Sequence, residues 1–240
     1  DNNGAALMFA MGIPLAYAFV ISAKHLWQKA GAGFLGLLLI HAVLMSYSRG
    51  AMLASIVGTG WLLLRDRNWL RGAVIGLALC GAVSILAGNE IRQRFISTAD
   101  YQQDGSANSR LRSWSAAWQI AWEHPFLGKG MRNSNEYSKN YGADLTGRTI
   151  HSQYLQIAAD SGIPAMAVYI AIVGGSLLYL QRARRWCLEA AQQFAPQESP
   201  RASGWGLVQQ MGHLTLGVET SLLVFAFGGV FLSLEVFELP

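Results

Sequence analysis

The sequence predicts an all-α polytopic membrane protein with about six transmembrane helices and one large structured external loop. Of its 240 residues, 52% are hydrophobic and only 13% are charged, whereas soluble domains carry about 25% charged residues. Six apolar stretches approach the length of about 20 residues that a helix needs to cross the hydrocarbon core. The basic residues gather in the connectors between these stretches, which is typical of membrane topology.

The expected spans are six apolar stretches separated by turns or polar connectors. They cover residues 4–22, 30–47, 51–64, 72–88, 163–180 and 212–234. The third stretch is short for a complete crossing. Because the chain opens with Asp1 and enters apolar sequence without the basic start of a signal peptide, we expect it to be part of a longer protein.

Positive charge in the connectors predicts the orientation of the chain. Basic residues follow the first, third and fifth spans, at Lys24, Lys29, Arg65, Arg67, Arg71, Arg182, Arg184, Arg185 and Arg201. Cytoplasmic connectors are rich in lysine and arginine, so these three connectors are predicted to be cytoplasmic. We therefore expect four spans in 1–88, a large external loop bearing the site in 89–160, and two spans with a basic cytoplasmic connector in 161–240.

The external loop contains a predicted amphipathic helix in the segment SRLRSWSAAWQIAWEHP. Its apolar residues recur near helical spacing, as expected for a helix at the membrane interface, and are Leu111, Trp114, Trp118, Ile120 and Trp122. Pro125 is expected to end this helix. The tryptophans fit an aromatic belt better than a direct role in binding sugar.

Three arginines on the external side are candidates for anion binding. Arg49 follows a turn in YSRGAMLAS, where it could reach out of the membrane as a structural residue or clamp a phosphate group. Arg110 and Arg112 stand in ANSRLRSW. If Asn108 or Ser109 caps this helix, the helix N-terminus would reinforce the arginines as an anion site. The alternative is a solvated pair on the surface.

His151 lies in TIHSQYLQIAADSGIP, just before the fifth apolar stretch. If Thr149 caps the following helix, the imidazole lies in the first turn, where the helix dipole favours the neutral base. Gly162 is expected to end that helix and Pro164 to begin the next one. The alternative is a histidine with only a structural hydrogen bond, which we assign to the others, His25, His41, His124 and His213.

Several other chemistries lack support in the sequence. It has no His-Glu-x-x-His helix, phosphate-binding loop, Gly-x-Ser-x-Gly elbow or paired Asp-x-Asp. Cys80 and Cys187 have no metal or redox spacing and are expected to be plain thiols. The net charge of +4 comes from the connectors, so we expect no nucleic-acid binding. Glu219, inside the last apolar stretch, either has a function or pairs with a neighbouring helix.

Four stretches, taken in order, carry a family resemblance. They read DNNGAALMFAMGIPLAY, YSRGAMLAS, DYQQDGSANSRLRSWSAAWQIAWEHPFLGKG and HSQYLQIAADSGIP. In this order they resemble the O-antigen ligase and O-antigen polymerase superfamily of bacterial inner-membrane glycosyltransferases, and look closest to the O-glycosylation ligases. The resemblance covers nearly the whole chain and identifies it as the C-terminal part of such a protein.

The resemblance implies transfer of a glycan from an undecaprenyl-diphosphate donor to an acceptor hydroxyl at the periplasmic face, with inversion and without a metal or other cofactor. The acceptor would be a glycolipid, a glycan or a protein. Arg49, together with Arg112 or Arg110, would bind the donor diphosphate, and His151 would take the proton from the acceptor. Tyr154 would have a supporting role.

One residue departs from the family pattern, because Ser152 stands where an asparagine often follows the histidine. This departure bears on the class of acceptor. A polymerase of the same superfamily would differ only in its acceptor. A lipid or polysaccharide transporter, with Arg49 and Glu219 along its pathway, is the alternative from another class, and a structural scaffold is the third. The ordered loop with its arginines and histidine favours the enzyme, with Glu219 as a supporting candidate.

Overall fold

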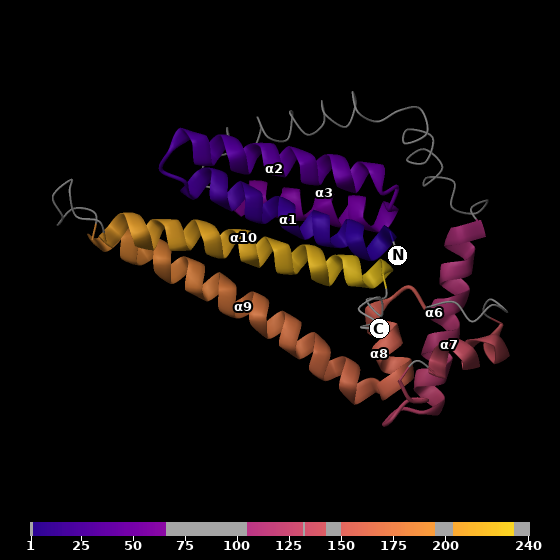
Figure 1. Ribbon diagram of the computed structural model, residues 1–240. Coiled ribbons are helices and arrows are strands. Elements are labelled where there is room, and N and C mark those ends of the chain that lie inside the picture. Colours follow the sequence, from indigo (N-terminus) through magenta and orange to yellow (C-terminus); the bar gives the residue numbers. More distant parts are fainter. Residues whose placement is uncertain (1, 66–104, 132, 143–149, 195–203, 233–240) are drawn as a thin grey trace. The chain divides into compact units, whose positions relative to one another are not determined.

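The computed structural model describes residues 2–65, 105–131, 133–142, 150–194 and 204–232, and all regular elements within these ranges are helical (Figure 1). They are α1 (Asn2–Ser22), α2 (Leu26–Met45), α3 (Arg49–Arg65), α6 (Gly105–Glu123), α7 (Asn133–Tyr137), the 3-10 helix η1 (Ser138–Tyr141), α8 (Gln153–Ser161), α9 (Ile163–Phe194) and α10 (Gly204–Phe231). The all-helical prediction is confirmed for this part of the chain.

Four described helices are long and apolar enough to cross a membrane. They are Asn2–Ser22, Leu26–Met45, Ile163–Gln193 and Gly206–Phe231. Each overlaps one of the predicted spans. The stretch 51–64 lies in α3, which has only 17 residues, and the stretch 72–88 lies outside the described residues.

Helix α9 is longer than the predicted span 163–180, because it continues to Phe194. Arg182, Arg184 and Arg185 therefore lie on a helix and not in a loop. The reason is that the polar segment QRARRWCLEAAQQF contains no glycine or proline and consists mostly of good helix formers. Hydropathy marked where the apolar part ends, whereas the helix itself continues.

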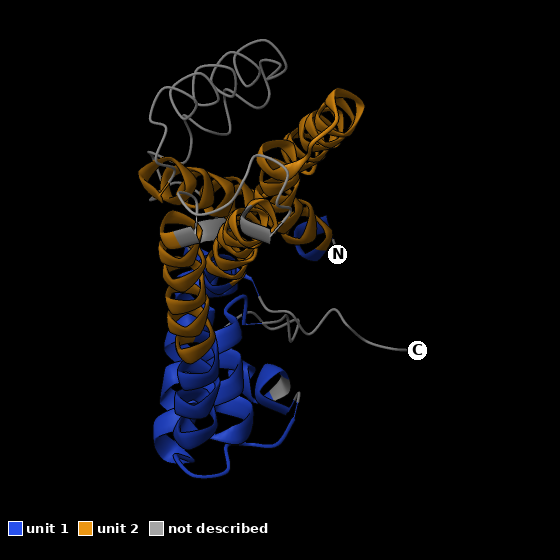
Figure 2. Ribbon diagram, turned by 90° about the vertical axis from the view of Figure 1, so that its left-hand side faces the viewer, with its two compact units in different colours: residues 1–4, 87–173, 226–240 blue, residues 5–86, 174–225 orange. Residues whose placement is uncertain are grey.

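The chain divides into two compact units (Figure 2). Unit 1 comprises residues 1–4, 87–173 and 226–240, and unit 2 comprises residues 5–86 and 174–225. Among the described elements, unit 1 contains α6, α7, η1 and α8, and unit 2 contains α2 and α3. Helices α1, α9 and α10 contribute residues to both units.

Small residues let the helices of unit 2 approach closely. A Cβ added to Gly58 of α3 would lie 2.3 Å from the Cγ2 of Val224 in α10. A Cβ added to Gly217 of α10 would lie 2.6 Å from the Cβ of Ala18 in α1. Small residues at such contacts are typical of helix packing in membranes, where van der Waals contact replaces the hydrophobic driving force.

Helix α6 packs on α8 in unit 1 around fully buried apolar side chains. These side chains are Ala117, Ile120, Ile150 and Ala159, with Trp114, Tyr141 and Leu155 packed against them. The structure confirms a helix that ends before Pro125.

The apolar side chains of α6 lie on two sides of the helix. Ile120 is buried against α8, whereas Leu111, Trp118 and Trp122 are exposed on the other side. The buried alanines of α6, such as Ala117, let one side of the helix pack against α8. The exposed Leu111, Trp118 and Trp122 form a second apolar side. The interfacial position of this helix stays a prediction.

Candidate functional site

His151 directly precedes the first turn of α8. The helix begins at Gln153 and its N-cap is Ser152, so the prediction that His151 lies in the first turn is wrong, and Thr149 lies outside the described residues. His151 has a backbone φ of 56°, and in the described ranges the only other non-glycine residue with positive φ is Tyr47. Such conformations are sparsely populated and occur most often at sites where the surrounding structure imposes them.

Hydrogen bonds from separate elements hold the backbone at His151. The indole Nε1–H of Trp114, on α6, donates to the His151 carbonyl oxygen at 3.4 Å. The N–H of Ile150 donates to the Oε1 of Gln156, on α8, at 3.3 Å. The side chain of His151 itself is only partly buried. The backbone is therefore held both before and at His151, and the histidine remains partly exposed.

A buried polar stripe on α8 supports this turn. Ser152, Gln156 and Asp160 follow one another at four-residue spacing, and 2–6% of each residue is exposed. The Nε2 of Gln156 donates to the Oδ2 of Asp160 at 2.8 Å and to the Oγ of Ser134 at 2.9 Å. The Oδ1 of Asp160 accepts from the N–H of Ser134 at 3.2 Å. Sequence reasoning missed Gln156 and Asp160, although their spacing from Ser152 places the three residues on one face of a helix.

The glycine-rich turn after α6 caps the C-terminal end of α8. The N–H groups of Lys129 and Gly130 donate to the carbonyl oxygens of Ala159 and Asp160, each at 2.9 Å. Gly128 has a φ of 61°, and a Cβ there would lie 2.3 Å from the carbonyl carbon of Asp160. The turn therefore requires glycine for both its conformation and its close approach. Its role is to satisfy carbonyl groups that a helix end leaves without partners.

Gly162 ends α8, as predicted. Its φ is 92°, and its N–H donates to the carbonyl oxygen of Ala158 at 3.0 Å. Pro164 lies in the first turn of α9, also as predicted. Since the N–H of Ile163 donates to the carbonyl oxygen of Pro125 at 2.8 Å, the junction between α8 and α9 is attached to the end of α6.

Arg110 and Arg112 lie inside α6 and not at its start. The helix begins at Gly105, so the predicted N-cap at Asn108 or Ser109 is wrong. The carbonyl oxygen of Ser109 accepts a hydrogen bond from Ser113 within the helix, at 3.1 Å. Arg112 is exposed and Arg110 is partly buried. The arginines thus share unit 1 with His151, but without reinforcement from the first turn of a helix.

Arg49 is the first residue of α3 in unit 2. The Oγ of Ser48 accepts from the N–H of Ala51 at 3.4 Å, which caps the helix. Tyr47, which precedes Ser48, has a φ of 55°. The predicted turn in YSRG is present, and Arg49 is partly buried at its end.

Tyr154 connects α8 to the last residues of α10. Its hydroxyl donates to the carbonyl oxygen of Ala226 at 2.7 Å, and its ring meets Tyr169 edge-on with 5.7 Å between ring centroids. Burial raises the pKa of the Tyr154 phenol above its ordinary range. These contacts give Tyr154 the role of an anchor for α8.

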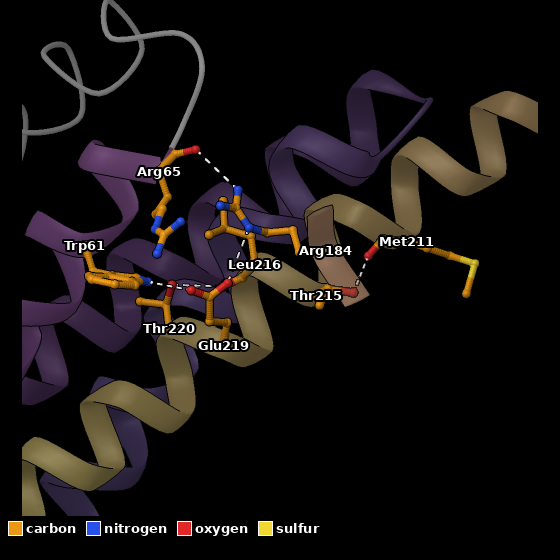
Figure 3. Close-up of polar contacts among 8 residues, drawn as sticks. All are labelled: Trp61, Arg65, Arg184, Met211, Thr215, Leu216, Glu219 and Thr220. Atoms are coloured by element: carbon orange, nitrogen blue, oxygen red, sulfur yellow. Dashed lines mark hydrogen bonds and ion pairs between the residues drawn. The ribbon is translucent and has the colours of Figure 1, made fainter. Parts of the chain in front are cut away.

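Glu219 is fully buried in unit 2 and has partners on two helices (Figure 3). Its Oε2 lies 3.3 Å from the Nε of Arg184 on α9, and its Oε1 accepts from the indole N–H of Trp61 on α3 at 2.9 Å. The Nη1 of Arg184 donates to the carbonyl oxygen of Arg65 at 3.4 Å. These contacts match the paired alternative for Glu219.

Comparison with known proteins adds one finding. The model of the O-antigen ligase family matches residues 34–170, which is more than half of the chain. This segment includes Arg49, Arg110, Arg112, His151 and Tyr154, but not Glu219. No curated protein and no solved structure matches the chain. With four helices apolar enough to span a membrane and a family match over most of its length, the chain is a membrane protein that belongs to the O-antigen ligase family.

Proposed function

We propose that this protein transfers a glycan from undecaprenyl-diphosphate to an acceptor hydroxyl at the periplasmic face of the bacterial inner membrane. The observation that carries this proposal is the geometry at His151. Within the segment that matches the family, this is a partly accessible histidine held in a left-handed turn by hydrogen bonds to its own and the preceding residue's backbone. A general base needs such a fixed position to contribute a rate factor of about 10² to 10⁴.

In the proposed reaction His151 takes the proton from the acceptor hydroxyl while its oxygen attacks the anomeric carbon of the donor glycan. The bond between that carbon and the phosphate oxygen breaks, and undecaprenyl diphosphate leaves with the bonding electron pair. Attack from the face opposite the leaving group inverts the anomeric configuration. The proton remains on His151 until it is released to solvent.

Arginine supplies the charge that the leaving diphosphate needs. Its guanidinium group stays protonated and can bind two phosphate oxygens at once. Arg49, Arg112 and Arg110 are the candidates, and Arg112 is exposed. Fixed cations of this kind stabilise the negative charge that develops as the anomeric bond breaks. The proposed transfer needs no metal ion.

The test uses the full-length protein reconstituted with an undecaprenyl-diphosphate glycan and candidate acceptors. His151→Asn is the informative variant, because asparagine tolerates the left-handed conformation but cannot serve as the base. We expect a loss of transfer of about 100-fold or more with donor binding retained. Arg49→Ala and Arg112→Ala should weaken donor binding instead. Normal transfer by His151→Asn at neutral pH would contradict the proposal, as would a loss of wild-type activity in EDTA.

The acceptor is determined in the same assay by offering a core glycolipid, a free glycan and a serine-containing protein separately. A single added chain on the glycolipid or the protein indicates a ligase. Stepwise lengthening of the glycan indicates a polymerase. The configuration of the new linkage, read by NMR, checks the predicted inversion.

A further inference from the structure

We propose that Gln156 is a positioning residue for His151 and that Asp160 sets the orientation of the Gln156 amide. The inference rests on the proposed function, because it takes His151 as the general base. Neither Gln156 nor Asp160 contacts the reacting groups in this proposal. Both act through the backbone of the turn that carries the imidazole.

The amide of Gln156 is fully engaged in the protein interior. Its Oε1 accepts from the N–H of Ile150, and its two Nε2 hydrogens are donated to Asp160 and Ser134. Only 2% of Gln156 is exposed, so water cannot replace a lost partner. An unsatisfied polar group in such a place is costly, which favours one arrangement of the whole network.

Asp160 selects which way the amide points. Rotation of a glutamine amide by half a turn exchanges its oxygen and its nitrogen with almost no change in shape. An ionised carboxylate can only accept hydrogen bonds. Asp160 already accepts from the N–H of Ser134, and its other oxygen, 2.8 Å from Nε2, requires a donor. The amide nitrogen must therefore face Asp160, which leaves the Gln156 oxygen for Ile150.

The orientation of Gln156 matters because Ile150 is joined directly to His151. The Gln156 oxygen holds the backbone before the left-handed residue, and Trp114 holds the carbonyl group of His151 itself. Loss of the first bond frees the turn to relax toward the more favourable right-handed region. The direction of the imidazole changes with the backbone, and small displacements of a catalytic group cost about 100-fold in rate.

The experiment exchanges the two functional groups in the reconstituted full-length protein. Gln156→Glu places two carboxylates face to face, and Asp160→Asn removes the group that selects the amide orientation. The double variant Gln156→Glu/Asp160→Asn restores a matched pair. In it the new carboxylate accepts from Ile150 and from the new amide, whose oxygen accepts from Ser134. We expect each single variant to lose about 10- to 100-fold in kcat with an unchanged KM for the donor, and the double variant to recover most of it.

A second readout follows the hydrogen bond itself. Exchange of the Ile150 amide hydrogen, measured by NMR on protein labelled with 15N-isoleucine, should be fast in both single variants and slow again in the double variant. Tyr141→Phe is the matched control. It removes the exposed hydrogen bond between Tyr141 and Glu123 in the same unit but keeps the ring that packs against the cluster containing Ile150, and it should leave kcat unchanged.

The outcomes separate this inference from the proposed function. An inactive His151→Asn protein together with wild-type kcat in both single variants would overturn the positioning role alone. The positioning role would also be overturned if kcat of the double variant were as low as that of the single variants. In that case, restoring a matched carboxylate and amide would not have restored the turn. Wild-type transfer by His151→Asn would overturn the proposed function. The positioning role of Gln156 would then fall as well, because it takes His151 as the general base.

Discussion

His151 and Tyr47 share a backbone conformation that residues with large side chains rarely adopt. Each such residue costs on the order of 1–3 kcal/mol and persists only where surrounding contacts impose it. Both lie in segments with candidate functional residues, Tyr47 beside Arg49 and His151 itself. The residue types drew attention to these segments, but the conformations were not predictable. At His151 the geometry depends on Trp114, which lies far away in the sequence.

Substitutions at His151 should separate folding from chemistry. We expect His151→Val to lower the free energy of unfolding by about 1–2 kcal/mol relative to His151→Asn, because a β-branched residue is strained at positive φ whereas asparagine is not. Thermal unfolding of the purified protein in detergent measures the difference. Equal melting temperatures for the two variants would show that the turn relaxes easily.

The buried phenol of Tyr154 predicts a loss of stability at alkaline pH. Its pKa is raised by burial in the folded protein, so the unfolded chain loses this proton first as the pH rises. The stabilising contribution is complete below the unfolded pKa of about 10 and is lost as the pH rises toward the folded pKa. Melting temperatures across this range should fall less steeply for Tyr154→Phe than for the wild type. Parallel curves would contradict the assignment.

Among the elements, the long periodic helices were predictable and their ends were not. Helical spacing of apolar residues predicted α6, the length of an apolar stretch predicted α10, and glycine and proline predicted the junction of α8 with α9. The start of α8 was wrong because the backbone before it is held by α6 and by Gln156, which local sequence cannot indicate. Burial of Gln156 and Asp160 was not predictable, because their partner Ser134 lies far from them in the sequence.

The exposed aromatic side of α6 should contact lipid. Trp118 and Trp122 lie edge to face with 5.6 Å between ring centroids, and both are exposed. If α6 lies at the interface, brominated lipids will quench their fluorescence. Trp27 and Trp186 are exposed as well, so the double variant Trp118→Phe/Trp122→Phe should lose part of the lipid-quenchable signal. Trp114→Phe, which removes a partly buried indole, should retain it.

The ion pair between α9 and α10 should be far more sensitive to single than to double substitution. Arg184 is 8% exposed and Glu219 is fully buried. Removing one partner leaves a buried charge and should cost about 3–5 kcal/mol. Arg184→Met/Glu219→Leu, which replaces both charges by apolar groups of similar size, should recover most of that loss. Melting temperatures of the single and double variants form the test, and additive losses would contradict it.

For the whole molecule, composition was sufficient to predict a helical membrane protein, and the order of motifs predicted its family. The division into 1–88, 89–160 and 161–240 and the orientation of the connectors stay predictions. An excess of lysine and arginine indicates which side of the membrane a connector lies on, because the insertion machinery responds to these charges. Contacts between the described residues do not indicate which side of the membrane a connector lies on.

Labelling with a membrane-impermeant thiol reagent tests the orientation. In a variant without Cys80 and Cys187, Asn140→Cys reports on the large loop and Gln193→Cys reports on the end of α9, since both positions are exposed. We expect intact spheroplasts to show labelling at position 140 only, and permeabilised ones to show labelling at both. The reverse pattern would place the large loop in the cytoplasm.

The pairing of Arg184 with Glu219 also has a consequence for how the protein is made. Each of these charges, carried alone into the membrane by its helix, adds about 2.5–3.5 kcal/mol to the cost of insertion when it lies near the bilayer centre. Synthesis places Arg184 in the chain before Glu219 emerges from the ribosome. A hairpin in which α10 meets α9 inside the insertion machinery would release both helices into lipid with their charges already neutralised. We therefore expect a nascent chain that stops before Glu219 to hold α9 less firmly in the bilayer than a chain that contains both charges.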